Sequence, residues 1–91
     1  MTQTEPTPAV RPSADVVARR IGDGAVLVHL PTNRIFELNH TAARLWELLE
    51  EGLDHAQILA RLAEEFEVDE ARTASDLDQC VQRFRRDGLL R

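Results

Sequence analysis

The sequence predicts an α+β domain in which a three-stranded antiparallel sheet is followed by three helices, in the order βββααα. Two patterns support this fold class. Short β-prone runs separated by turn residues extend to residue 39, and apolar residues then recur at spacings of three and four as far as residue 87. A chain of 91 residues with 43% apolar content suits one compact domain with a small core. The order and the short connectors make the arrangement winged-helix-like.

The three strands are predicted to follow an N-terminal tail. Residues 1–15 hold three of the four prolines and offer little to bury, which predicts a disordered tail before a domain over residues 16–91. Gly22-Asp23-Gly24 supplies the positive φ angles that a tight turn needs. The predicted strands are Val16–Ile21, Ala25–Leu30 and Ile35–Asn39.

The stretch from Ile35 to Gly52 runs from the third strand into the first helix with almost no connector. Asn39 or Thr41 is expected to accept a hydrogen bond from the first helical turn. One face of the helix carries Ala42, Leu45, Trp46 and Leu49. Trp46 is therefore expected in the core, and the junction should fix the geometry of the whole domain.

The second and third helices follow from caps and periodicity. Asp54 and Gln57 have the spacing of a capping box, which places the start of the second helix there. Its apolar face is predicted to contain Ile58, Leu59, Leu62, Ala63 and Phe66. The third helix is predicted to begin between Asp69 and Thr73 and to run to Asp87, with Gly88 as its C-cap. Its apolar positions are Ala74, Leu77, Val81 and Phe84.

The charge balance argues against a nucleic-acid surface. Eleven Arg and no Lys stand against 16 Asp and Glu, a net charge of −5, whereas phosphate binding usually requires a basic face. The single cysteine, Cys80, has no internal disulfide partner, and the first residues lack the charged segment and apolar run expected of a signal peptide. No apolar run approaches the roughly 20 residues that span a bilayer. We therefore expect a cytoplasmic protein that binds no nucleic acid and no membrane.

No group of residues predicts catalysis, a metal site or a cofactor. His29, His40, His55 and Cys80 are scattered, and no pair has the short spacing of zinc ligands. Cys80 has no identifiable base beside it, and adjacent acids such as Glu64-Glu65 fit a solvated helix face. The arginines at positions 83, 85 and 86 have two readings: they could bind phosphate or an acidic peptide, or they oppose the macrodipole of the third helix.

The third strand offers a binding edge. In a three-stranded meander it lies at the rim of the sheet, where unpaired N–H and C=O groups can be completed by another extended chain. Ile35 and Phe36 are apolar, and Arg34 and Glu37 give only partial charge protection. If the third helix lies alongside, the two elements form a groove suited to a peptide.

The pattern of the second half resembles a known family. Leu38-Asn39, Thr41-Ala42-Ala43, Leu45-Trp46-Glu47-Leu48 and Gly52, the run from Ile58 through Phe66 to Val68-Asp69, and the terminal Asp87-Gly88-Leu89-Leu90 are similar to the PqqD-like family. Its members are small recognition elements that bind the leader peptides of ribosomally made, modified peptides. The resemblance covers about residues 16 to 90.

The resemblance implies a non-catalytic domain without a cofactor. A precursor leader peptide adds as a strand to the third strand and packs on the third helix, and a peptide-modifying enzyme then acts on the delivered peptide. The implied peptide-binding residues are Arg34, Ile35, Phe36, Glu37 and Leu38 on the strand and Asp76, Leu77, Cys80, Val81, Phe84 and Arg85 on the helix.

The segment from His29 to Arg34 indicates the branch of the family. It is more similar to stand-alone members found beside lasso-peptide peptidases and cyclases than to members that work beside a radical enzyme. The alternative function is a winged-helix nucleic-acid-binding regulator, with the second and third helices as a helix-turn-helix. The net charge of −5 on the chain and the acids Asp76 and Asp78 on the third helix count against that alternative.

Overall fold

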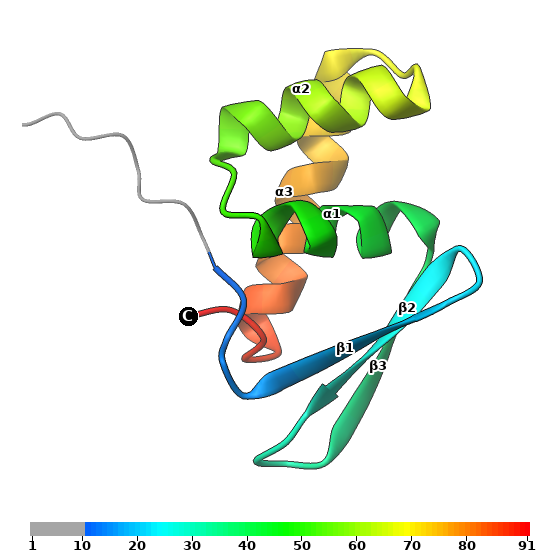
Figure 1. Cartoon of the computed structure of the whole chain (residues 1–91). Helices are drawn as coiled ribbons and strands as arrows, with labels where there is room; N and C mark the ends of the chain where they lie inside the picture. The colour runs from blue at the N-terminus through cyan, green and yellow to red at the C-terminus, as the bar shows by residue number, and fades with distance from the viewer. Residues whose placement is uncertain (1–10) are drawn as a thin grey trace, which may run out of the picture.

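The computed structural model describes residues 11–91 and confirms the predicted fold class. Three strands form an antiparallel sheet in the order β1-β2-β3, and three helices follow (Figure 1). The strands are β1 (Val16–Ile21), β2 (Gly24–His29) and β3 (Arg34–Leu38), and the helices are α1 (His40–Glu50), α2 (His55–Phe66) and α3 (Glu70–Arg86).

The sheet is built around β2, which has a buried and an open face. Ala25 and Leu27 point toward the helices and are buried, whereas Val26 and Val28 lie on the opposite face and are half-buried. β2 and β3 each begin and end one residue earlier than predicted. β2 begins at Gly24, where only glycine fits, because a Cβ at this position would collide with the carbonyl oxygen of Leu38.

The junction between β3 and α1 ties the sheet to the helices. Leu38 ends the strand as a buried residue, and Asn39 caps the helix by accepting a hydrogen bond of 2.9 Å from the backbone N–H of Ala42. Of the two predicted caps, Asn39 is the one used, so a single residue separates strand from helix.

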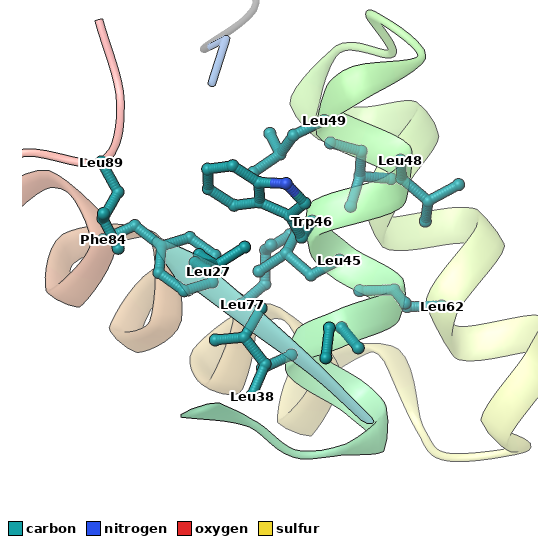
Figure 2. Close-up of a cluster of buried hydrophobic side chains, with 14 residues drawn as sticks. Leu27, Leu38, Leu45, Trp46, Leu48, Leu49, Leu62, Leu77, Phe84 and Leu89 are labelled. Carbon is teal, nitrogen blue, oxygen red and sulfur yellow. The ribbon is translucent and has the colours of Figure 1, made fainter. Parts of the chain in front are cut away.

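The core lies between α1, the inner face of the sheet and α3 (Figure 2). Trp46 is 2% exposed, as predicted, and its ring meets that of Phe84 edge-on at a centroid distance of 5.4 Å. The indole N–H donates to the Glu50 carboxylate at 3.0 Å, so the buried ring keeps its polar group paired. Leu27 and Leu48 are fully buried in the same cluster.

The helices do not all cover the sheet. α1 packs against β2 and β3, and α2 packs on α1 and α3, on the side away from the strands (Figure 1). The predicted capping box at Asp54 and Gln57 is present and starts α2. α3 begins after Asp69, whose carboxylate accepts from Ala71 and Arg72, and Gly88 follows its end with a φ of +75°.

The two ends of the described chain lie together. Pro12 forms a bridge with Leu90, and the Ser13 N–H donates to the Leu89 carbonyl at 2.9 Å. Residues 1–10 of the predicted disordered tail lie outside the described residues, and residues 11–13 run beside residues 89–91. Within residues 11–91, no helix has the length and apolar content that crossing a membrane requires.

An ion-pair network joins three elements on the surface. The Arg44 guanidinium of α1 contacts Glu47 at 2.9 Å and Glu65 of α2 at 2.8 Å, and Glu47 also pairs with Arg20 of β1. Burial tends to raise the pKa of Glu47, but hydrogen bonds from Arg44 and Arg20 outweigh burial and hold this pKa below its ordinary value of 4.5. The hydrogen bond from Arg44 likewise lowers the pKa of Glu65.

We predict that this network stabilises the fold at neutral pH but not in acid. Both carboxyl pKa values are lowered by folding, so their contribution is present above about pH 4.5 and is lost as the pH falls through the folded values. These side chains are about a third exposed, so Arg44→Met should lower the free energy of unfolding by only about 0.5 to 1 kcal/mol at pH 7. Urea unfolding at pH 7 and pH 3 measures this; an equal loss at both values would contradict an electrostatic role.

Candidate peptide-binding site

β3 forms a rim of the sheet. It pairs with β2 along one side, and within residues 11–91 no strand pairs with its other side. Its backbone therefore presents an edge that a further strand can complete. The edge is short and carries no proline, and Ile35 is 66% exposed on it.

The side chains of β3 alternate between the two faces of the sheet. Arg34, Phe36 and Leu38 lie on the helix side, opposite His29, Leu27 and Ala25 of β2. The Arg34 guanidinium lies 4.8 Å from the centre of the Phe36 ring, which is a cation–π contact. Ile35 and Glu37 point to the opposite face. A peptide on the helix side of this edge would therefore meet Arg34 and Phe36.

A groove of about 590 Å³ lies beside α3, between this helix and the start of α1. We call it the α3 groove. No residue of β3 lines it, but Asn39, the next residue along the chain, does. The predicted groove between β3 and α3 is thus a groove between α3 and the junction that follows β3. The lining residues are Asn39, Thr41, Ala42, Asp76, Gln79, Cys80, Gln82, Arg83 and Arg86.

A smaller pocket of about 250 Å³ adjoins the α3 groove between the three helices. We call it the apolar pocket because Leu45, Leu62, Phe66 and Leu77 form much of its wall. It shares Thr41, Ala42, Asp76 and Cys80 with the α3 groove, so the two spaces lie next to each other. Together they offer a polar channel with an apolar recess, which suits a peptide with a large apolar side chain.

Three of the predicted peptide-binding residues belong to the core. Leu38, Leu77 and Phe84 are 5%, 3% and 1% exposed (Figure 2). Leu38 and Phe84 line neither space, and Leu77 reaches only the wall of the apolar pocket. These side chains pack α3 against α1 and the sheet, so they position the site without facing a bound peptide.

The other predicted helix residues divide between two faces of α3. Asp76 and Cys80 line both the α3 groove and the apolar pocket. Val81 and Arg85 line neither space, because their side chains point to a different side of α3. The sequence pattern does not predict Gln79 or Gln82, and it gives Arg83 and Arg86 two readings, as a contact for phosphate or an acidic peptide or as a complement to the helix dipole. The helical spacing could have identified three of these residues, because Gln79, Arg83 and Arg86 follow Asp76 at intervals of three and four and so share its side of the helix.

The groove is electrically asymmetric along α3. Asp76 lies at one end, and Arg83 and Arg86 follow seven and ten positions later, about 10 and 15 Å along the helix axis. All three side chains are exposed. A bound peptide would meet a negative charge beside the apolar pocket and positive charges toward the C-terminal end of the helix.

Each of the three histidines contacts a neighbouring side chain other than another histidine. His29 contacts the Thr32 hydroxyl at 2.8 Å, His40 packs edge-on against Phe66, and His55 lies 3.2 Å from Asp78. In the part of the chain that the structure describes, no group of three or more His, Cys, Asp or Glu is placed to hold a metal ion. Burial raises the pKa of the Cys80 thiol, with a smaller opposing effect from Arg83, so this side chain is a neutral thiol at pH 7.

Comparisons with known proteins place the site in context. Residues 24–90 match the family described as Coenzyme PQQ synthesis protein D (PqqD). Among solved structures, TbiB1 in complex with the TbiA(beta) leader peptide is 34% identical, with a TM-score of 0.84 over 88% of this chain and 93% of that one. Lasso peptide synthetase B1 complexed with the leader peptide is 23% identical, with a TM-score of 0.82 over 90% and 96%, and supports the fold alone. No curated protein matches significantly.

We predict that Cys80 reacts slowly with thiol reagents. Because its pKa lies above the ordinary 9.0, the reactive thiolate is scarce at pH 7, and half-burial limits access. Alkylation by iodoacetamide at pH 7 should be roughly tenfold slower in the folded protein than in urea, where Cys80 becomes an ordinary thiol. Equal rates in the two states would contradict this placement of Cys80.

Proposed function

Because the chain belongs to the PqqD family, we propose that it captures the leader of a ribosomally synthesised precursor peptide and delivers it to a peptide-modifying enzyme. The leader adds as a strand to β3, and its anchoring side chains enter the α3 groove and the apolar pocket. The observation that carries the proposal is the open β3 edge beside these two spaces, in a fold shared with a relative solved with its leader bound.

Strand pairing and side-chain anchoring have different roles in this binding mode. Each backbone hydrogen bond contributes roughly 1 kcal/mol net, whereas burying a large apolar side chain contributes about 1.5 to 3 kcal/mol. Pairing with Arg34–Leu38 therefore sets the register, and the apolar pocket sets which leader is accepted. Ordering a flexible peptide consumes part of this gain, so the expected dissociation constant is about 10⁻⁶ to 10⁻⁹ M.

The charges of the α3 groove favour a particular leader. Arg83 and Arg86 attract an acidic residue of the peptide, and Arg34 on the helix side of β3 offers a further positive charge to an added strand. Asp76 disfavours a second acid beside the apolar pocket. An acidic side chain on one side of the apolar anchor only is therefore the pattern we expect in the leader.

The proposed role is recognition without chemistry by this chain. The partner enzyme supplies the reaction. A peptidase or cyclase of the lasso-peptide type is favoured over a radical enzyme because the segment from His29 to Arg34 is more similar to the stand-alone family members found beside such enzymes. The comparisons give no support to the alternative of a nucleic-acid-binding regulator.

A backbone methylation scan of the leader tests strand addition. Alternate residues of an added strand point their N–H groups toward β3, so methylating single peptide nitrogens should weaken binding at every second position along the paired segment. Calorimetry of each peptide with the full chain measures the effect. Amide shifts in the protein should concentrate at residues 34–38 and along the α3 groove; shifts centred on Arg61 and Glu65 of α2, or a scan without a two-residue period, would refute the proposal.

Charge reversal tests the assignment of the groove. Arg83→Glu with Arg86→Glu should weaken leader binding roughly three- to tenfold at low salt, and the difference should shrink as salt screens these exposed charges. Arg61→Glu with Arg72→Glu makes the same change in net charge on helix surfaces outside the groove. An equal loss in both double variants would show a general charge effect and would remove Arg83 and Arg86 from the site.

A further inference from the structure

The outer face of the sheet is apolar and uncovered. All three helices lie on the other side (Figure 1). Val17 of β1 is 49% exposed, Ile35 of β3 is 66% exposed, and the half-buried Val28 of β2 lies between them in register. This row crosses all three strands, so the apolar side chains form one continuous surface, which we call the outer face. The proposed leader site uses the backbone edge of β3 and the two spaces on the helix side, and leaves the outward-pointing side chains of the outer face free.

The next row of the outer face is charged at its two ends. Arg19 of β1 and Glu37 of β3 both align with Val26 of β2, so they stand on opposite sides of the central strand at the same level. Neither forms an ion pair with another residue in the range 11–91. The face therefore carries a positive charge on one flank and a negative charge on the other, with apolar side chains between them.

This pattern is complementary to itself. A half-turn about an axis parallel to β2, midway between two facing sheets, places β1 of each copy over β3 of the other. Arg19 then faces Glu37 of the second copy, this pair occurs twice, and Val17 faces Ile35. Strands related in this way run nearly parallel, which matches the aligned packing of sheets about 10 Å apart. A two-fold axis across the strands would instead place β1 over β1 and β3 over β3, so Arg19 could not face Glu37.

We propose that the outer face binds a second copy of this chain to form a two-fold symmetric dimer. The footprint is small, roughly 16 Å along the strands by 14 Å across them, against about 800 Å² per partner in a standard interface. The dimer is therefore weak, with a dissociation constant of about 10⁻⁵ to 10⁻³ M. It leaves the free edge of β3 and the α3 groove open, so one dimer presents two leader sites.

Sedimentation of the full chain, from about 10 μM to 1 mM, tests the proposal. We use about 0.15 M salt because the net charge of −5 on each copy would otherwise oppose association. The native chain should show a reversible monomer–dimer equilibrium. Val17→Glu on β1 should weaken the dimer at least tenfold, while its thermal unfolding and its leader affinity stay close to those of the native chain.

Mixing two charge variants gives the sharpest result. Arg19→Glu alone and Glu37→Arg alone should each weaken self-association at least fivefold, because both interfacial pairs become repulsive. An equimolar mixture of the two variants should associate again, since each copy then faces opposite charges at both pairs, and the double variant should also recover. A chain that stays monomeric at 1 mM, or a mixture no more associated than its components, would overturn the proposal and leave the face to a different partner.

Discussion

The direct passage from β3 into α1 is the constraint on which the rest of this structure depends. Leu38 is held in the core, and Asn39 both leaves the strand and caps the helix. With no loop between them, the strand edge and the helix axis cannot move independently. The same residue lines the α3 groove, so the geometry of the binding surface is set by the packing of the core.

α3 serves the core and the binding surface with different sides of one helix. Leu77 and Phe84 point inward, and the contact of Phe84 with Trp46 anchors the C-terminal half of the helix to α1. Asp76 and Arg83, each one position before a core residue, face the groove. Because one helix carries both sets, the core contacts of α3 also fix the position of its groove-facing side.

The two faces of the sheet have separate roles in this interpretation. The helix side, with Leu27 buried, holds the domain together, and the rim at β3 is left for the leader. The outer side carries Val17 and Ile35 with little cover, although a small domain gains by burying such residues. A surface of this kind, at the back of the leader site, gives the protein a second means of association that does not compete with the first.

The sequence alone determined the order of the elements, their caps and the core stripes, because these depend on interactions between residues a few positions apart. The capping box at Asp54 and the burial of Trp46 are local or periodic features of this kind, whereas the structure decided between Asn39 and Thr41 as the cap of α1. The candidate site was predicted less completely. Periodicity placed Leu77, Phe84, Cys80 and Asp76 on one helix, but only the packing of α3 against α1 decided that the first two are core and the last two face the groove. Arg83 and Arg86 line the groove and Arg85 does not, for the same reason. Successive residues of a helix are rotated by about 100°, so neighbouring arginines face different directions. Which of them face the groove depends on how α3 is oriented, and contacts distant in the sequence fix that orientation.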